Sequence, residues 1–554
     1  MSAAAEPVPI ESAKKSPAKG GVKAPNSTSE AISSLTPELV IALCGPIGSP
    51  LHEVGDQFKS ALRKYEYRTE CIRLSKAISD NAVAGEVSNN LSRYDEIKAM
   101  IVAGDRLRLD HGNDVLAKIA IAKISADREA VYGPENDAGP DDGSYASQRV
   151  CHVIDSIKNK SELELLRLIY GEALIAVGVF SPVEVRISNL QRSSEGVMTL
   201  DEVKDLIDID SGEEFSHGQS VRDTFPRCDF FLRVDDSISG ASEDDATGQI
   251  ASKVSRLLGL VFRTAVTTPT PEEAAMYASA SAARNSACLS RQVGAAVTSS
   301  GGELLAVGWN DVPQPGGGLY GKPPVNVIYS GRVVGDQRCF SQTGMKCHND
   351  EEKKKIANLL ADLLAKEGVV AEDKKGLAAE AIAKSRVKDL IEFSRAVHAE
   401  MHAILTAGRV AGEKIVGGKI FVTTYPCHAC ARHIVAAGIS EIHYIEPYRK
   451  SLATKLHDDA LTEAARDAQS KVVLLQFDGV APRRFIDFFE AGDRKSGGVL
   501  KLPGKDAAKP ATQVSMRAIP KLEEVVVAEL ATKNFNLPSL SKSTVRGQAN
   551  VGEE

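Results

Sequence analysis

Two short motifs constrain the fold of this chain more strongly than any other feature. His398-Ala399-Glu400 is followed, after 25 residues, by Pro426-Cys427-His428-Ala429-Cys430. One imidazole and two thiolates can hold a zinc ion and leave its fourth position open, whereas a structural zinc site usually has four protein ligands. His398, Cys427 and Cys430 are therefore the predicted zinc ligands, and the chain must fold so that the two motifs meet.

The residues around both motifs predict that each lies at a helix N-terminus. Apolar residues recur at helical spacing after His398. Residues 419–424 are rich in β-branched and aromatic side chains, as in a buried strand. Residues 427–437 then predict a helix that ends at Gly438. Backbone N–H groups at a helix N-terminus favour thiolate over thiol, and so favour metal binding.

The pattern H-x-E…P-C-x-x-C is the signature of zinc nucleobase deaminases. The chain resembles the cytidine and deoxycytidylate deaminase superfamily over about residues 272–450, which implies that Glu400 is the catalytic proton shuttle. Zinc lowers the pKa of a bound water toward about 7, and Glu400 would pass its proton to the base and then to the departing amino group. A redox pair or half of a zinc ribbon is the alternative for Cys427 and Cys430, but the chain has no second C-x-x-C.

Residues on either side of the zinc motifs supply candidates for substrate binding. Residues 274–287 predict a helix, and residues 290–310 predict two strands joined by a hairpin turn at 299–302. The family resemblance implies that Asn310 contacts the sugar and that Arg291 lines the nucleotide site; a surface ion pair is the alternative for Arg291. By the same resemblance Tyr448 stacks on the base or sugar. Arg449 is a candidate phosphate contact, with a solvated loop as the alternative.

An insertion at about residues 311–395 separates Asn310 from the zinc motifs. Cys339, Cys347 and His348 lie in its polar first part, and a structural zinc near this position in some deoxycytidylate deaminases makes them candidate ligands of a second zinc. Residues 351–393 show apolar residues at helical spacing and predict a helical hairpin broken near Gly368. This hairpin would cover the site or pack between subunits.

The N-terminal half predicts a separate α/β domain. An apolar run at residues 38–43 leads into a Gly-rich loop before a helix, the context of a phosphate-binding loop, with Gly45, Gly48 and Ser49 as candidate contacts. Pro50-Leu51-His52 stands where that motif would have its lysine, which disfavours phosphoryl transfer. Strands predicted at 151–156, 173–180 and 229–233 alternate with helices and indicate a doubly wound parallel sheet. The Asp155 at the end of one of them is either a structural residue or a relic of metal binding.

The combination of the two domains resembles the bacterial anti-phage dCTP deaminases, in which a degenerate P-loop kinase-like domain is fused to a deaminase domain. The expected fold is α/β: an N-terminal kinase-like doubly wound parallel sheet, then a cytidine-deaminase-like three-layer α/β/α domain. The expected divisions are a disordered tail at 1–34, the kinase-like domain at 35–265, the deaminase domain at 266–500 and a partly docked tail at 501–554.

This resemblance implies hydrolysis of dCTP to dUTP and of dCMP to dUMP, which would deplete the dCTP pool during phage infection. It also implies a homo-oligomer, since related deaminases often form hexamers, and an inhibitory small noncoding RNA. Two alternatives remain open: a base-flipping deaminase that acts on RNA or DNA, and a non-catalytic nucleotide sensor or regulated toxin scaffold.

Composition restricts these readings. With 554 residues, of which 43% are hydrophobic, the chain can bury two cores. Nine scattered cysteines suit a reducing cytosol, so a cytoplasmic location is expected. No apolar run is long enough to span a bilayer, so no membrane partner is expected. The net charge of −7 argues against a general nucleic-acid binder.

Overall fold

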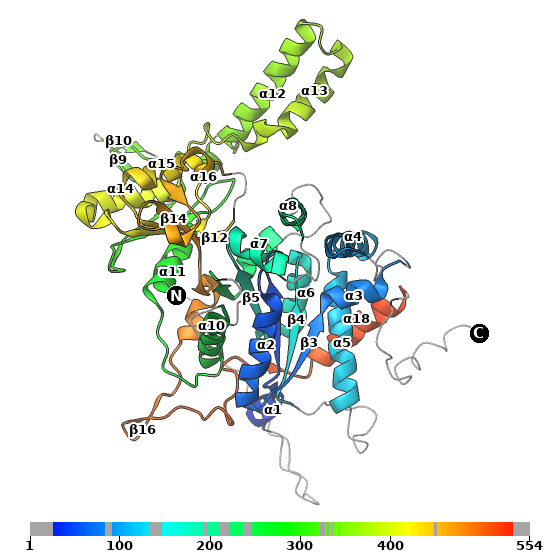
Figure 1. The fold of residues 1–554 in the computed structure, drawn as a ribbon. Helices are drawn as coiled ribbons and strands as arrows, with labels where there is room; N and C mark the ends of the chain where they lie inside the picture. The colour runs from blue at the N-terminus through cyan, green and yellow to red at the C-terminus, as the bar shows by residue number, and fades with distance from the viewer. Residues whose placement is uncertain are drawn as a thin grey trace, which may run out of the picture.

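The computed structural model places most of the 554 residues. The described residues are 26–83, 91–132, 147–192, 198–210, 221–236, 246–321, 327–329, 332–334, 336–342, 344–447, 451–533 and 535. Within these ranges the chain forms two six-stranded sheets covered by helices (Figure 1).

The first sheet has the strand order β15-β6-β5-β2-β4-β3. The strands from β3 to β6 run parallel, and β15 pairs antiparallel with β6 at the edge. The strands are β2 (Leu39–Cys44), β3 (Arg68–Arg73), β4 (Val150–Asp155), β5 (Leu174–Phe180), β6 (Phe230–Arg233) and β15 (Gly479–Val480). The predicted parallel sheet in the N-terminal half is confirmed.

Helices cover both faces of this sheet, because the inner strands are apolar on both sides. All six residues of β2 are buried. Its alternate residues join two different clusters, one with α2 (Leu51–Leu62) and α10 (Ala246–Val261), the other with α3 to α6. The helices of the second face are α3 (Leu74–Asn81), α4 (Arg93–His111), α5 (Val115–Tyr132) and α6 (Lys160–Tyr170). Such a sheet is doubly wound, as the sequence predicts.

The second sheet has the order β13-β14-β12-β11-β7-β8. The hairpin β7–β8 and the pair β7–β11 are antiparallel, and the rest are parallel. The strands are β7 (Gly294–Thr298), β8 (Leu304–Trp309), β11 (Lys419–Thr424), β12 (Glu441–Glu446), β13 (Leu461–Thr462) and β14 (Val472–Gln476). α11 (Pro271–Ala283) packs on one face, while α14 (Ala399–Ala411) and α15 (His428–Ala436) pack on the other. This is the predicted three-layer arrangement.

After β14 the chain returns to the first sheet. β15 extends that sheet, and β18 (Val514–Ser515) pairs with β1 (Leu35–Thr36). α18 (Ile519–Ala531) packs against α5 and α6, and Figure 1 shows it beside α5. The buried Arg128 of α5 binds Glu523 of α18 at 3.0 Å and Glu38 at 2.8 Å. Nothing in the sequence pattern indicates that residues beyond 478 contribute a strand to the N-terminal sheet; the domain boundaries stay predictions.

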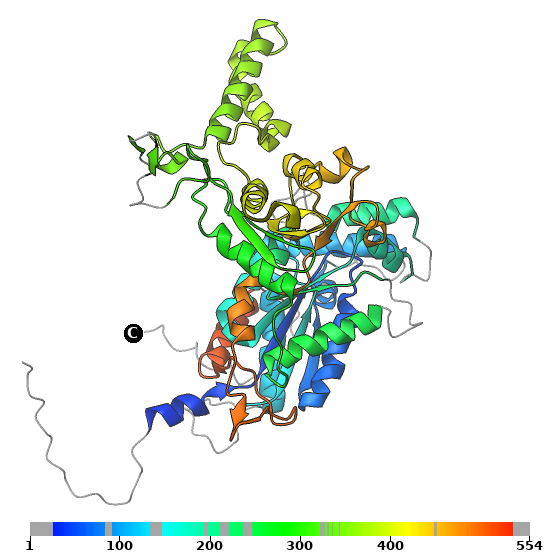
Figure 2. The ribbon, with the colours of Figure 1, turned by 90° about the vertical axis from the view of Figure 1, so that its left-hand side faces the viewer.

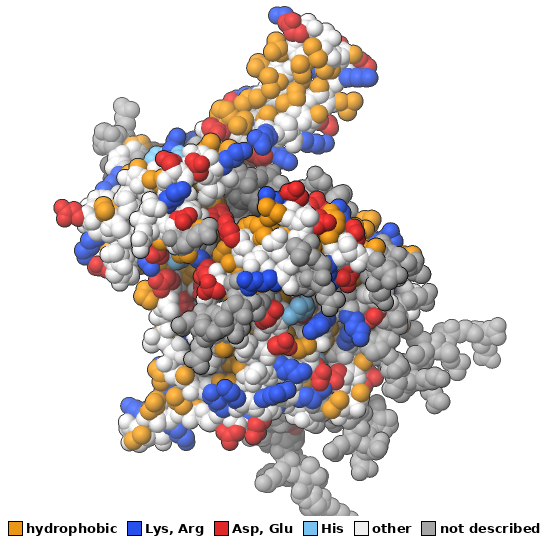
Figure 3. All heavy atoms as spheres, viewed as in Figure 1, with side chains coloured by type: hydrophobic (Ala, Val, Ile, Leu, Met, Phe, Trp, Pro, Cys, Tyr) orange, Lys and Arg blue, Asp and Glu red, His pale blue; other side chains and the backbone are white. Residues whose placement is uncertain are grey.

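The insertion forms the predicted helical hairpin. α12 (His348–Lys366) and α13 (Lys375–Lys384) pack on each other, and Gly368 adopts φ +69° in the turn between them. Both ribbon views show the hairpin projecting from the rest of the chain (Figure 2). Apolar side chains run along it, with Leu359, Leu363 and Leu377 exposed (Figure 3). The predicted homo-oligomer stays a prediction.

The remaining elements are helices of four to eleven residues and two-stranded sheets. They include α1 (Ser27–Ser33), α7 (Val183–Arg192), α8 (Leu200–Asp210), α9 (Val221–Thr224), α16 (Ala453–Leu456), α17 (Phe485–Phe489) and the small strand pairs β9 (Val327–Tyr329) with β10 (Arg332–Val334) and β16 (Lys495–Ser496) with β17 (Val499–Leu500). Among the described helices, none has both the length and the apolar character that a bilayer span requires.

Candidate active site

The two motifs meet because α14 and α15 begin side by side. His398 is the N-cap residue of α14, and Cys427, which follows the buried strand β11, is the N-cap residue of α15. The Cys427 Sγ accepts a hydrogen bond from the backbone N–H of Cys430 at 3.4 Å. A sulfur at a helix N-terminus is thereby held close to the positive end of the helix dipole.

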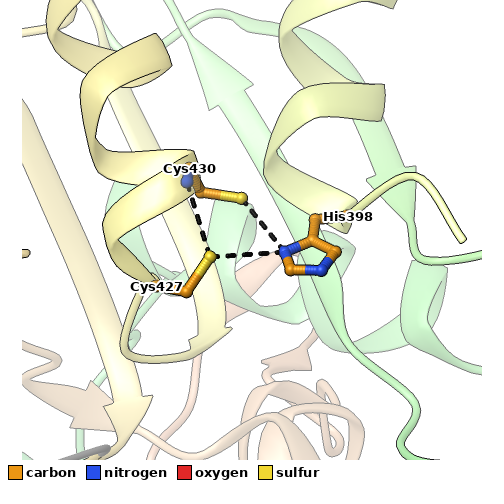
Figure 4. Close-up of side chains that lie close together, drawn as sticks. All are labelled: His398, Cys427 and Cys430. Atoms are coloured by element: carbon orange, nitrogen blue, oxygen red, sulfur yellow. Dashed lines mark hydrogen bonds between the residues drawn. The ribbon is translucent and has the colours of Figure 1, made fainter. Parts of the chain in front are cut away.

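The predicted zinc ligands face one another. The Nδ1 atom of His398 lies 3.4 Å from the Sγ atom of Cys427 and 3.3 Å from that of Cys430 (Figure 4). Their ligand atoms all lie within 4.8 Å of one another, as a shared metal ion requires. Hydrogen bonds with Cys430 and His398 lower the pKa of the Cys427 thiol to about 4, so that this sulfur is a ready thiolate ligand. Two sulfurs and one imidazole fit zinc and leave room for a further ligand.

Glu400 is buried beside these ligands in the first turn of α14. Its side chain is 3% exposed, and His398, Cys427 and Cys430 are its electrostatic neighbours. Burial raises the pKa of Glu400, because the charged carboxylate loses its hydration. A carboxyl group in this position is suited to take up and release a proton beside the metal ligands.

Close packing of β8 on α14 sets the position of Glu400. A Cβ atom on Gly308 would lie 2.4 Å from the backbone nitrogen of Ala403 and 2.5 Å from the carbonyl oxygen of Ala399. Only glycine allows this approach. One turn into α14, the Nδ1 atom of His402 accepts a hydrogen bond from the Trp309 N–H at 3.2 Å. His402 thus links β8 to α14, and it is not one of the predicted metal ligands.

The structure gives Asn310 and Arg291 local partners. The Oδ1 atom of Asn310 accepts a hydrogen bond from Val293 N–H, and its Nδ2 donates to the Arg291 carbonyl, both at 2.8 Å. Asn310 therefore shapes the loop that precedes β7. Arg291 forms an ion pair with Glu446, the last residue of β12. Their predicted contacts with nucleotide stay predictions, and the predicted Tyr448 and Arg449 lie outside the described residues.

The candidates for a second metal line a small pocket. Cys339, Cys347 and His348 surround a cavity of about 20 Å³, close to the space one water molecule needs. Cys288 lines the same cavity, and it supplies the fourth candidate ligand that is not evident in the sequence. Within the described part of the chain only His398, Cys427 and Cys430 are close enough together to share an ion. The second zinc stays a prediction.

The Gly-rich loop of the N-terminal half lies where the sequence predicts, between β2 and α2. Gly48 adopts φ +82°, and an added Cβ there would meet the backbone of Arg186 at 2.8 Å. The carbonyl of Gly45 accepts a hydrogen bond from Lys158 Nζ at 3.0 Å. The buried Ser49 hydroxyl has no hydrogen-bond partner among the described residues. The predicted phosphate contacts of these three residues stay predictions.

The region that carries the candidate metal ligands matches a known protein family. Residues 269–446 match the family model of the cytidine and deoxycytidylate deaminase zinc-binding region, over less than half of the chain. The C-terminal region therefore contains a cytidine and deoxycytidylate deaminase domain. The match includes His398, Glu400, Cys427 and Cys430, and the family description agrees with zinc as the cofactor that the donor set fits.

Individual relatives are similar over shorter stretches. ComE operon protein 2 of Bacillus subtilis (strain 168) is 43% identical over 56 residues, which are 10% of this chain and 29% of that protein. The deoxycytidylate deaminase of Mus musculus is 31% identical over 107 residues, 18% of this chain and 51% of that protein. The chain thus spans about a third to a half of the length of these relatives.

One solved structure aligns over nearly its whole length, but its sequence identity and TM-score are both low. The crystal structure of dCMP deaminase from the cyanophage S-TIM5 in complex with dCMP and dUMP has 18% sequence identity and a TM-score of 0.22, covering 38% of this chain and 99% of that chain. A TM-score of this size adds nothing to the family match.

Proposed function

We propose that this protein is a zinc-dependent hydrolytic deaminase of deoxycytidine nucleotides, which converts dCMP to dUMP and dCTP to dUTP with release of ammonia. One observation carries the proposal: the buried Glu400 lies beside a His398, Cys427 and Cys430 group whose ligand atoms are within 4.8 Å of one another. The name of the mouse relative, deoxycytidylate deaminase, supports a cytosine mononucleotide as one substrate.

Three of these residues bind the metal, and Glu400 moves protons. Zinc held by His398, Cys427 and Cys430 supplies Lewis-acid activation of a water molecule. Glu400 takes a proton from the attacking water and delivers it to N3 of the pyrimidine. The water oxygen adds to C4 and makes this carbon tetrahedral. Glu400 then takes the remaining proton from the new C4 hydroxyl and gives it to the amino group, so that the C4–N bond breaks, ammonia leaves and a C4 carbonyl remains. Its buried position keeps solvent from competing for that proton.

The proposed physiological role is depletion of the dCTP pool in anti-phage defence. The arrangement of an N-terminal parallel α/β sheet before the deaminase domain supports it, because that arrangement is the basis of the resemblance to anti-phage dCTP deaminases. The same resemblance supports a homo-oligomer in the cytoplasm that a small noncoding RNA holds inactive until infection.

The two alternatives make different predictions for one substrate panel. Zinc-loaded protein is incubated with dCTP, dCMP, CTP, cytidine and a cytosine-bearing oligonucleotide, and ammonia release is measured. Turnover of dCMP or dCTP supports the proposal. Turnover of the oligonucleotide alone indicates a base-flipping deaminase, which the net charge of −7 disfavours. No turnover at full zinc occupancy indicates a non-catalytic sensor.

The role of Glu400 is tested with Glu400→Gln and a matched control. Glu400→Gln keeps the shape of the side chain but removes the proton shuttle, so we expect unchanged zinc content and a loss of about 10²–10⁴-fold in kcat. Glu413→Gln, in the exposed turn that follows α14, should behave as wild type. Deamination by Glu400→Gln at the wild-type rate would show that another group moves the proton.

A further inference from the structure

A large cleft opens at the carboxyl edge of the first sheet, in a different part of the molecule from the zinc ligands. It has a volume of about 770 Å³, and its walls come from the Gly-rich loop, the ends of β3 and β4, and helices α3, α4 and α7. This edge is where open parallel sheets bind their ligands. A cleft of this size holds a ligand much larger than a single phosphate.

A carboxylate of the protein itself already binds to the Gly-rich loop. The Ile47 N–H donates to the Oδ2 atom of Asp210 at 2.7 Å, and Lys158 Nζ donates to the Oδ1 atom of Asp210 at 2.8 Å. Asp210 is buried at the end of α8. Its carboxylate therefore accepts hydrogen bonds from donors that a phosphate would otherwise use. A phosphate bound in this cleft has to find other cations.

Two such cations stand on the facing wall. Arg73 is the last residue of β3 and Lys76 lies in the first turn of α3, and both are exposed residues of the cleft lining. Neither forms an ion pair with the part of the chain that the structure describes. Two other cations of the lining are neutralised, since Arg93 binds Glu96 at 2.7 Å and Arg108 binds Glu162 at 2.9 Å. Arg73 and Lys76 thus remain available for an anionic ligand.

His52, at the start of α2, lies near this group but is already paired with a carboxylate. Its Nδ1 atom lies 2.5 Å from the Oδ2 atom of Asp155, and its side chain is 59% exposed on the cleft lining. The other oxygen of Asp155, Oδ1, is buried and has no hydrogen-bond partner among the described residues. A buried carboxylate that is only half satisfied favours a positively charged imidazole beside it. Arg73 is an electrostatic neighbour of His52, so these two residues lie close together on the cleft wall.

Part of the lining is apolar and can hold a ring. Leu74, Ile78, Ile97, Met100 and Leu190 line the same cleft. A ligand that places phosphate on the cationic wall and a heterocycle on these side chains would use both surfaces. We infer that this cleft binds a nucleoside phosphate through Arg73 and Lys76, with the phosphate displaced from the Gly-rich loop to the facing wall.

Calorimetry on the zinc-loaded full chain tests this binding directly, without relying on deaminase activity. The probes are AMP, ATP, dTMP, dTTP, the nucleosides adenosine and thymidine, and inorganic phosphate. We expect at least one nucleotide to bind, with each nucleoside and inorganic phosphate weaker by about tenfold or more, because a nucleoside lacks the charge-assisted contacts and phosphate alone lacks the apolar ones. No binding of any nucleotide at millimolar concentration would overturn the inference.

Variants locate the site. The double variant Arg73→Gln, Lys76→Gln should weaken nucleotide binding by about tenfold or more, and Lys76→Gln alone should weaken it less. Lys64→Gln, in the turn after α2 at the opposite edge of the sheet, should have no effect. Unchanged affinity in the double variant would place the phosphate elsewhere and refute the assignment. Zinc content and dCMP turnover of the double variant should match wild type, so a failed deaminase proposal and a failed cleft proposal give different results.

Discussion

Replacing Gly308 by alanine should reduce deaminase activity far more than it reduces stability. The added methyl group would lie 2.4 Å from the backbone nitrogen of Ala403, whereas ordinary contacts begin at 3.4 Å. Both neighbouring atoms belong to the backbone of α14, so no side chain can rotate away. Strand β8 and helix α14 must separate by about 1 Å, which is the shortfall between these two distances.

The magnitude follows from what α14 carries. Overpacking of this size costs about 1–3 kcal/mol of folding free energy, and the loss of glycine flexibility returns about 0.5–1 kcal/mol. The domain should therefore stay folded. The same shift moves Glu400 relative to Cys427 and Cys430, which are held on α15. A displacement of about 1 Å at a catalytic group can cost about 10²-fold in rate, so we expect kcat for dCMP to fall by about that factor.

Gly408→Ala in the same helix is the matched control. Nothing lies within 4 Å of a Cβ atom at this position, so alanine should stabilise α14 by about 0.8–1 kcal/mol and leave kcat unchanged. The assays are zinc content, thermal unfolding and initial rates with dCMP and dCTP for both variants. Wild-type kcat in Gly308→Ala would refute the argument that this contact positions Glu400, and equal losses in both variants would point to a general effect on the helix.

Three further predictions concern pH, metal content and the buried ion pairs. The hydrogen bond with Asp155, opposed by partial burial, raises the pKa of His52 above 6.5. The stability that this pair contributes is therefore fully present below about pH 6.5 and is lost as pH rises through the folded pKa. The difference in unfolding free energy between wild type and His52→Gln should shrink over the same pH range, and a constant difference would contradict this. The predicted second site requires two zinc ions per chain and one in Cys347→Ser, with the exposed Cys71→Ser as control; one ion in all three proteins, which the spacing of the described ligand atoms favours, would eliminate this site. Arg128→Met leaves two buried carboxylates without their cation, and denaturant unfolding should show a loss of about 3–5 kcal/mol; a loss below about 1 kcal/mol would mean that the C-terminal helix docks without this network.

Local sequence was sufficient where chemistry and backbone geometry are short-range. The zinc ligands could be predicted because a His-x-Glu segment and a Cys-x-x-Cys segment each occupy a single helix start, where spacing along the chain decides which side chains emerge together. Periodicity predicted the α12–α13 hairpin and the alternation of strands and helices for the same reason. The apolar run at residues 38–43 indicated the strand β2, and the structure shows that all six of its residues are buried.

Other features depend on which distant segments pack together. That β15 joins the N-terminal sheet and that Glu523 meets Arg128 involve residues hundreds of positions apart, and two-residue strands leave no periodic signal. Cys288 reaches the pocket of Cys347 only after β7 and the insertion have folded. Asp210 occupies the Gly-rich loop only because α8 ends there. The sequence by itself determined which metal-binding and acid–base side chains lie at the helix starts. Tertiary packing decided which surfaces meet, because contact free energy depends on distance in space, whereas a local pattern specifies distance only along the chain.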